Sequence, residues 1–152
     1  MSSQSMQPES EVPFAATLMV RDACLCLHAQ RAARALARRF DIALKPAGLS
    51  SGQFSLLMSL NRPKPASLGS VAALLAMDRT TVTANLKPLQ RRNLVEMRQD
   101  ETDRRLRLLS LTPAGHAALR KALPIWIELH GAIEADLPDP SRLRAEFGLL
   151  SE

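Results

Sequence analysis

The hydrophobic pattern of this chain changes from a helical period to a strand period at Asn93, and no other feature constrains the fold as strongly. From Val82 to Leu89, apolar residues recur every three or four positions, as they do along one face of a helix. After Asn93, the segments 94–98 and 106–111 follow a period of two, and a polar tip separates them. The pattern therefore predicts a helix that leads directly into a β-hairpin.

A second, shorter helix is expected immediately before this one. Ser67 opens it, and a tight turn then leads to Asp78, a favoured N-cap residue for the helix over 78–93. The residues expected on the buried side of the short helix are Leu68, Val71, Leu74 and Leu75. In the longer helix, Pro88 frees the carbonyl of Ala84 and predicts a local kink.

The remaining elements are predicted to be helical. Aromatic residues make up only 3% of the 152 residues and tyrosine is absent, so Leu, Ala, Val and Ile must form the core, which favours helices over a β-sandwich. One long helix is expected from about 14 to 45, one from Ser50 or Ser51, one from Thr112 to about 137 with a kink at Pro124, and a last one capped by Ser141. Residues 1–13 are expected to form a disordered tail. The fold class is therefore mainly α with a small β-hairpin.

Most of the net charge of +5 lies in one stretch. Between Arg79 and Arg107, eight basic residues face four acidic ones, which leaves a local charge of +4. A basic surface is compatible with nucleic acid, an acidic membrane surface or an acidic protein partner.

The outer face of the 78–93 helix combines small hydroxyl groups with cations. Threonine side chains can meet base edges in the major groove of DNA, while Lys and Arg contact phosphates. Taken alone, this face is more typical of the solvated side of an ordinary helix. The short helix before it and the hairpin with a basic tip after it favour a winged helix-turn-helix, because a wing arginine can enter the minor groove. The candidate DNA-binding residues are Arg79, Thr80, Thr81, Thr83, Lys87, Arg91, Arg98, Arg104 and Arg105.

The stretch from Ser67 to Gly115 resembles the MarR family of bacterial transcriptional regulators. The similarity rests on Thr80-Thr81-Val82-Thr83, on Asn93-Leu94-Val95, on Asp103-Arg104-Arg105 and on Leu111-Thr112-Pro113-Ala114-Gly115. It extends upstream through Leu49-Ser50-Ser51-Gly52-Gln53-Phe54. Asn93 stands where the family usually has glycine, a mild change because Asn tolerates the left-handed conformation at a helix end.

The resemblance implies a homodimer that binds a pseudo-palindromic operator on double-stranded DNA. A DNA-binding lobe is expected over about 50–111, and dimerisation helices over about 14–46 and 112–150, within a single regulator covering 14–152. Asp103 would support the wing by pairing with an arginine, and Arg104 or Arg105 would enter the minor groove. The regulator, expected to be a repressor, would be released by a small aromatic or phenolic effector. Candidate effector-pocket residues are His28, Arg31 and Phe54, whereas Trp126 is expected in the core.

One branch of this family senses peroxides through a cysteine, which an ungapped alignment places at Cys26. The tyrosines that hold the sulfur there correspond to Phe40 and Ser51, and neither can do so in the same way. Cys24 and Cys26 are therefore expected to be small packing residues, with a thiol sensor as the alternative. Cys24 and His28 share a helix face, but two ligands fall short of a zinc site, and no metal or cofactor is expected.

Other classes of function receive little support from the sequence. It contains no nucleophile–base arrangement, no paired carboxylates and no phosphate-binding glycine loop, so no enzyme is expected. A winged helix that binds an acidic protein instead of DNA is the other alternative. The polar N-terminus lacks the features of a signal peptide, and no apolar run reaches membrane-spanning length, so a cytoplasmic protein with no membrane partner is expected.

Overall fold

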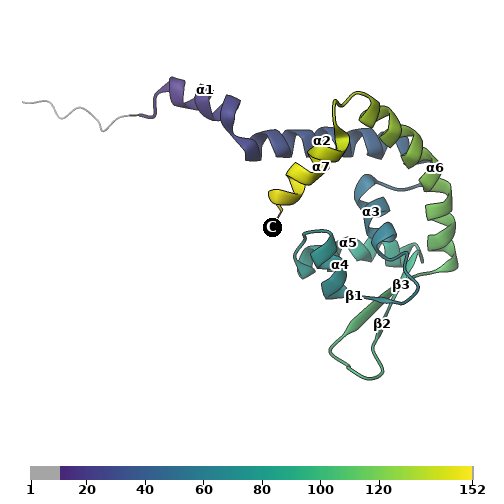
Figure 1. Ribbon diagram of the computed structural model, residues 1–152. Coiled ribbons are helices and arrows are strands. Elements are labelled where there is room, and N and C mark those ends of the chain that lie inside the picture. The colour runs from purple at the N-terminus through teal and green to yellow at the C-terminus, as the bar shows by residue number, and fades with distance from the viewer. Residues whose placement is uncertain (1–10, 152) are drawn as a thin grey trace, which may run out of the picture. The chain divides into compact units, whose positions relative to one another are not determined.

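The computed structural model describes residues 11–151, which form two compact units that divide between Leu36 and Ala37. The first unit holds α1 (Phe14–Ala23) and the beginning of α2 (Leu25–Ala43), whose last turns belong to the second (Figure 1). The expected tail at 1–13 lies mostly outside the described residues. A single regulator over 14–152, with the lobes given above, stays a prediction.

The single helix predicted from 14 to 45 is wrong, because Cys24 interrupts it. Cys24 adopts an extended conformation (φ −71°, ψ 107°) between α1 and α2. Its N–H still donates to the carbonyl of Val20 at 2.9 Å, and its Sγ accepts from the backbone N–H of Leu27 at 3.4 Å. Cys24 thus ends one helix and caps the next with its sulfur. The apolar period continues across the break, so the pattern could not reveal it.

The second unit continues from α2 through a short connection. A 3-10 turn, η1 (Lys45–Ala47), ends at Gly48, which has a left-handed φ of 70°. Helix α3 (Ser51–Ser59) then begins with a capping box. The Ser50 hydroxyl accepts from the N–H of Gln53 at 3.1 Å, and the Gln53 side chain accepts from the N–H of Ser50 at 3.1 Å. Of the two predicted caps, Ser50 is the one used.

The predicted hairpin is present, and a third strand joins it. Strands β2 (Val95–Gln99) and β3 (Arg107–Leu111) pair antiparallel, with Met97 opposite Leu109. The two-residue strand β1 (Ala66–Ser67) pairs with the other edge of β3, which gives the order β1-β3-β2. A strand of two residues carries no period, so the sequence predicted Ser67 only as a helix cap.

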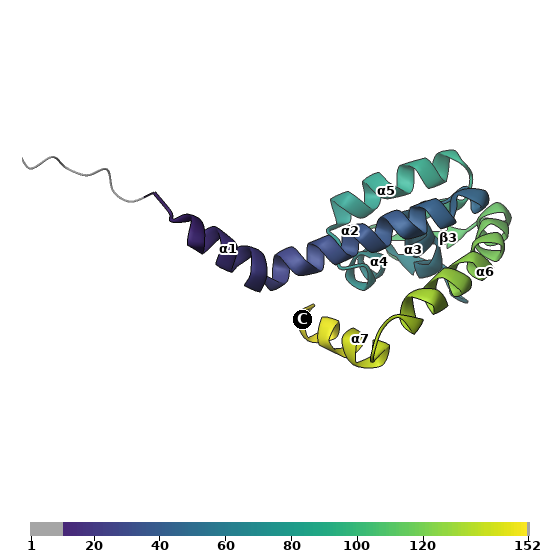
Figure 2. The ribbon, with the colours of Figure 1, turned by 90° about the horizontal axis from the view of Figure 1, so that it is seen from above.

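Helices α4 (Leu68–Leu74) and α5 (Arg79–Arg91) pack on each other and, with α3, enclose the core of this unit (Figure 2). Fully buried side chains from α3, α4, α5 and β3, together with Leu44 just before η1, meet there: Leu44, Leu57, Val71, Val82, Leu86, Leu89 and Leu109. The prediction for α4 was wrong at Leu74, which is 63% exposed, whereas Ala72 is buried in its place. The buried side of α4 is therefore formed by the adjacent residues Val71 and Ala72, and not by the predicted stripe that included Leu74.

Helix α6 (Pro113–Ala135) follows β3, with Thr112 as its N-cap and Pro113 at the first position, as predicted. Pro124 lies inside the helix, which continues past it. Helix α7 (Pro140–Leu149) is capped by Asp139, whose carboxylate accepts from the N–H of Arg142 at 2.9 Å. The prediction of Ser141 as the cap was wrong. Proline favours the first helical position, because it has no N–H that would be left without a partner there. The helix therefore begins at Pro140, and the cap is the residue before it, Asp139. No helix in residues 11–151 is long and apolar enough to cross a membrane.

Candidate nucleic-acid interface

Helix α5 presents a polar face on the opposite side from its three buried residues. Val82, Leu86 and Leu89 anchor the helix in the core. The predicted positions on its other sides are exposed, except for Thr83, which is half-buried: Arg79, Thr80, Thr81, Lys87 and Arg91. The helix therefore offers two cations in its second half and small side chains near its start.

The threonines differ in how free their hydroxyl groups are. The Thr81 hydroxyl donates to Oδ2 of Asp78 at 2.7 Å, and the Thr83 hydroxyl donates to the carbonyl of Arg79 at 2.8 Å. Both can still accept hydrogen bonds but have their hydrogen engaged. Thr80 has no side-chain hydrogen bond to another residue within 11–151 and can both donate and accept. Among the three, Thr80 is the best placed to contact a base edge.

Asp78 anchors the start of α5 with both carboxylate oxygens. Its Oδ1 accepts from the backbone N–H of Thr81 at 2.8 Å while Oδ2 takes the Thr81 hydroxyl. The side-chain hydrogen bond from Thr81, followed by the backbone one, holds the pKa of Asp78 below its usual value. The N-cap predicted from the sequence is confirmed.

The turn between α4 and α5 contains a backbone conformation that no local pattern predicted. Ala76 has a φ of 51°, in the left-handed region where a Cβ is strained. Asn93, at the other end of α5, has a φ of 55°, as expected of a residue that replaces the usual glycine. Both ends of α5 are thus set by left-handed residues.

Arg79 lies close to the preceding helix. A Cβ built on Gly69 would approach Nη2 of Arg79 to 2.9 Å, so the guanidinium covers the first turn of α4. In this position it occupies the side of α5 next to α4, which suits a contact with the DNA backbone better than one with a base edge. Pro88 lies within α5, which is helical from Arg79 to Arg91 without interruption.

The wing between β2 and β3 is held by its acidic residues. The backbone N–H of Arg105 donates to Oδ1 of Asp103 at 3.0 Å, and the N–H of Leu106 donates to the Asp103 carbonyl at 2.9 Å. Asp100 donates its N–H to the Leu106 carbonyl at 3.0 Å, which closes the loop. Within residues 11–151, Asp103 forms no ion pair with an arginine, so it braces the backbone rather than pairing with a guanidinium.

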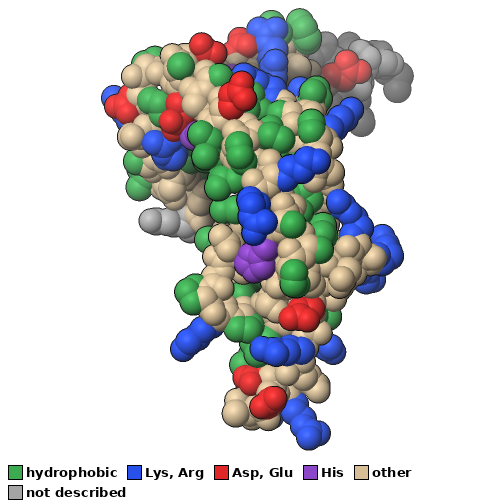
Figure 3. Space-filling view, turned by 90° about the vertical axis from the view of Figure 1, so that its right-hand side faces the viewer, with side chains coloured by type: hydrophobic (Ala, Val, Ile, Leu, Met, Phe, Trp, Pro, Cys, Tyr) green, Lys and Arg blue, Asp and Glu red, His purple; other side chains and the backbone are tan. Residues whose placement is uncertain are grey.

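The basic side chains of the wing remain available. Arg104 and Arg105 are exposed at the tip, and Arg98 is exposed on β2, without an ion pair to another residue of the described chain. Figure 3 shows the wing at the lower end of the view, carrying both basic and acidic side chains. The braced loop therefore presents exposed arginines, although the acidic residues Glu96, Asp100, Glu101 and Asp103 equal the arginines of the wing in number.

A comparison with known proteins identifies the family. The model of the MarR family matches residues 49–106, which span α3 to the wing. The transcriptional repressor MprA of Escherichia coli (strain K12) is 31% identical over 116 residues, which cover 75% of this chain and 62% of that repressor. The M. tuberculosis transcriptional regulator MosR, solved in complex with DNA, is 35% identical, with a TM-score of 0.79 over 84% of this chain and 93% of MosR. The chain belongs to the MarR family.

A second solved structure adds a regulator that responds to a small molecule. Bordetella bronchiseptica BpsR, whose DNA binding is regulated by 6-hydroxynicotinic acid, is 26% identical, with a TM-score of 0.61 over 81% of this chain and 96% of BpsR. The aligned part of MprA is a little under two thirds of that repressor, whereas the two structures are covered almost completely.

The second unit of this MarR family member also contains a cavity of about 390 Å³. It is lined by residues of α3, α4 and α6, namely Phe54, Ser55, Met58, Ser59, Leu74, Leu123 and Trp126. Phe54, predicted for an effector pocket, therefore lies in a cavity wall. Trp126, expected in the core, is half-buried and lies in the same wall, with its ring stacked on that of Phe54 at 6.2 Å between centroids. Sequence periodicity could not place them together, because they lie on different helices.

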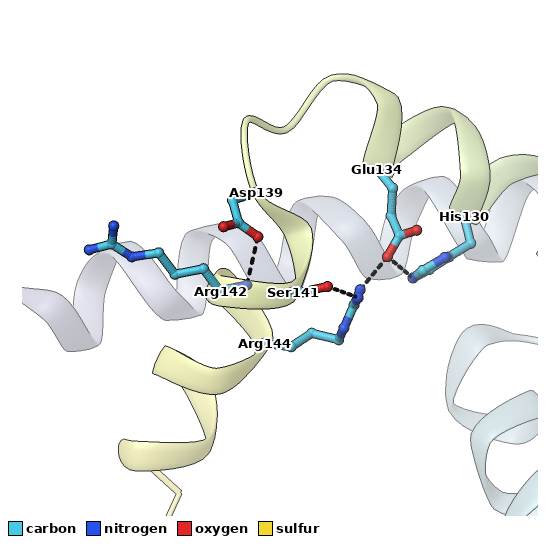
Figure 4. A network of polar contacts seen from close by, with 6 residues as sticks. All are labelled: His130, Glu134, Asp139, Ser141, Arg142 and Arg144. Atoms are coloured by element: carbon cyan, nitrogen blue, oxygen red, sulfur yellow. Dashed lines mark hydrogen bonds and ion pairs between the residues drawn. The ribbon is translucent and has the colours of Figure 1, made fainter.

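Beyond Trp126, a row of contacts reaches α7. The His130 ring stacks on Trp126 at 4.4 Å, and its Nε2 lies 3.9 Å from Oε1 of Glu134. Glu134 also forms an ion pair with Arg144 of α7, and Arg144 donates to the Ser141 hydroxyl at 3.2 Å (Figure 4). These contacts connect the cavity wall to the last helix.

The other predicted pocket residues lie in the first unit. His28 and Arg31 are exposed on α2, and the His28 ring contacts the carbonyl of Cys24 at 2.8 Å through Nδ1. Cys24 is half-buried and Cys26 exposed, and both are free thiols. The Cys26 sulfur accepts from Nε2 of Gln30 at 3.3 Å. No group of three or more metal-ligating side chains occurs within residues 11–151.

Proposed function

We propose that this chain is a DNA-binding transcriptional regulator, a repressor that binds a pseudo-palindromic operator as a homodimer and is released by a small molecule. The observation that carries the proposal is the pairing, in one compact unit, of the exposed face of α5 with the braced basic wing. In this arrangement α5 enters the major groove, while Arg104 or Arg105 reaches the adjacent minor groove.

The cations and the threonine on this surface have different roles in DNA binding. Lys87 and Arg91 lie one turn apart in the second half of α5 and contact phosphates, while Thr80 faces the bases. Arg79 and Arg98 add phosphate contacts on either side. The repressor name of MprA and the DNA complex of MosR support this assignment.

A homodimer follows from the apolar surface of the terminal helices. None of the residues of α1, α2 or α7 is buried. Phe14 on α1 is 73% exposed and Leu149 on α7 is 74% exposed. Exposed apolar side chains on each of these helices mark interaction surfaces, and a second copy of the chain would cover them.

The effector would bind in the cavity between α3, α4 and α6. The regulation of BpsR by 6-hydroxynicotinic acid supports a small ring compound as the class of ligand. A regulator of this kind carries out no chemistry on its ligand or on DNA, and it acts in the cytoplasm, where the DNA is.

The test compares specific with random DNA. The purified protein is titrated against a fluorescent fragment of the promoter beside its own gene and against a scrambled fragment of the same length. We expect the promoter fragment to bind at least about 10³-fold more tightly at physiological salt. Arg104→Ala should weaken binding to the promoter, whereas the control Arg21→Ala, which removes an exposed arginine from α1, should not. Equal affinity for the two fragments would refute the proposal and favour a protein-contact module.

A further inference from the structure

Gly69 lies in the first turn of α4, and its backbone does not require a glycine. Within residues 11–151, only Gly48, Ala76 and Asn93 have a left-handed φ, so the backbone of Gly69 is open to any residue. Glycine is also less favourable than alanine inside a helix, because it loses more conformational freedom on folding. The local structure of α4 therefore gives no reason for a glycine at this position.

The contact between Gly69 and Arg79 does require one. Outside the adjoining backbone of α4, the three heavy atoms nearest to a Cβ on Gly69 all belong to the Arg79 guanidinium group: Nη2 at 2.9 Å, Cζ at 3.5 Å and Nε at 3.7 Å. At 2.9 Å, a methyl group and Nη2 could not both keep their places. Helices α4 and α5 pack on each other, so the start of α5 lies within reach of this contact. The guanidinium group is therefore ordered by a close contact that alanine would remove.

The donors of the Arg79 guanidinium group are free although its position is set. The side chain is exposed, and within residues 11–151 it forms no hydrogen bond or ion pair. Only the backbone carbonyl of Arg79 is engaged by a side chain, because it accepts from the Thr83 hydroxyl at 2.8 Å. A guanidinium group offers five N–H donors in one plane and can bind a phosphate through two of them. Packing on Gly69 thus orders the arginine without using the donors that a phosphate needs.

We propose that Gly69 is a positioning residue for DNA binding, because it lets the Arg79 guanidinium group lie against α4, where it contacts a phosphate of the DNA backbone. Ordering a free arginine side chain on binding costs about two- to tenfold in affinity, and an arginine that is already ordered avoids this cost. Phosphates carry no sequence information, so the gain applies to every DNA sequence. The inference rests on the proposed function and adds to it a residue of α4 that acts through Arg79.

The test measures DNA affinity and stability in Gly69→Ala. The full chain is titrated against the promoter fragment at physiological salt, and its thermal unfolding is recorded. We expect the affinity to fall about two- to tenfold. The melting temperature should stay the same or rise, because alanine favours the helix and the end of the arginine side chain can move aside. A lower melting temperature would assign Gly69 a role in packing and overturn the inference, and so would an unchanged affinity.

Gly52→Ala is the matched control. Gly52 is the second residue of α3, as Gly69 is of α4, and nothing lies within 4 Å of a Cβ at Gly52. The control should bind the promoter fragment as the original protein does. A loss equal to that of Gly69→Ala would show that the effect does not come from the contact with Arg79.

A double-mutant cycle tests whether Gly69 acts through Arg79. Arg79→Ala should reduce the slope of log affinity against log salt by about one, as expected for the loss of one phosphate contact. Adding Gly69→Ala to Arg79→Ala should cause no further loss, because the side chain that Gly69 positions is then absent. If Gly69→Ala weakens binding equally in both backgrounds, or if Arg79→Ala leaves the slope unchanged, the inference fails.

The proposed function and this inference can fail separately. Equal affinity of the original protein for the promoter and scrambled fragments would refute sequence-specific regulation, while the effect of Gly69→Ala would still be measurable on either fragment. If the original protein prefers its promoter and Gly69→Ala binds it equally well, only the role of Gly69 is refuted.

Discussion

The carbonyl oxygen of Leu94 lies so close to the α-carbon of Gly115 that no Cβ fits between them. The same junction contains two further contacts to the first turn of α6. The Thr112 hydroxyl donates to the carbonyl of Asn93 at 2.6 Å, and the Thr112 N–H donates to the carbonyl of Leu94 at 3.1 Å. The end of α5, the start of β2 and the start of α6 are therefore joined at one point. The glycine of the Leu-Thr-Pro-Ala-Gly motif is thus required by backbone packing.

Gly115→Ala should strongly destabilise the protein. The new methyl group would overlap a backbone oxygen that cannot rotate away, so we expect a loss of about 3 kcal/mol or more in the free energy of unfolding. Gly131→Ala in the same helix is the control, because nothing lies within 4 Å of its Cβ. That change should stabilise α6 by up to about 1 kcal/mol. Urea unfolding measures both, and similar effects at the two sites would contradict the packing at Leu94.

Ala76→Gly should stabilise the protein. Relief of the left-handed strain at Ala76 should raise the free energy of unfolding by about 1–2 kcal/mol. The greater conformational freedom of glycine in the unfolded chain should reduce this gain by about 0.4–1 kcal/mol. Ala73→Gly, at an exposed helical position three residues earlier, should instead destabilise by about 0.5–1 kcal/mol. Thermal unfolding distinguishes them, and a loss of stability in Ala76→Gly would mean that the turn is not strained.

The contribution of the Asp78 carboxylate should depend on pH. Its pKa is lowered in the folded state by the hydrogen bonds from Thr81, so its stabilising effect is fully present above the unfolded pKa of about 3.9 and is lost as the pH falls through the lower folded value. Asp78→Asn keeps a capping oxygen but removes the charge. The variant should therefore be less stable than the original protein at pH 7, and the difference should shrink below about pH 3.9 in chemical unfolding curves. A constant difference from pH 7 to 3 would exclude the carboxylate as its source.

Lys87→Ala should alter the salt dependence of DNA binding. Loss of one phosphate contact reduces the slope of log affinity against log salt by about one and weakens binding to all sequences alike. Thr80→Val removes a hydroxyl group that faces outward from α5 and should change the preference among sequences with little effect on that slope. Titrations at several salt concentrations test the pair. An unchanged slope in Lys87→Ala would place this residue away from the phosphates.

Glu134→Gln should loosen the attachment of α7. The change removes the ion pair with Arg144, which joins α6 to α7 and, as a partly exposed pair, contributes about 0.2–1 kcal/mol. Glu146→Gln is the matched control, because Glu146 pairs with Arg142 within α7 itself, at 2.8 Å. Hydrogen exchange of 140–149 should become faster in Glu134→Gln and change little in Glu146→Gln. Equal exchange in the two variants would show that α7 is held by other contacts.

The local signals in the sequence predicted most of the elements correctly. A cap needs only a residue and its neighbour three positions later, so Asp78, Thr112 and Ser50 could be recognised directly. The change of period at Asn93 depends equally on nearby residues, and it predicted the helix and the hairpin that form the candidate interface. Where two local signals competed, as at Asp139 and Ser141, the sequence pattern selected the wrong one.

The tertiary structure decided what lies between the elements. The wall shared by Phe54 and Trp126, the exposure of Leu74 and the strand at Ala66 each depend on contacts between segments far apart in the chain. The sequence by itself determined the periods and caps, and therefore the helices and the wing, because these are set within one or two turns of backbone. The cavity and the fit of Gly115 against Leu94 were decided only when the helices packed, because close packing depends on side chains that no local period relates.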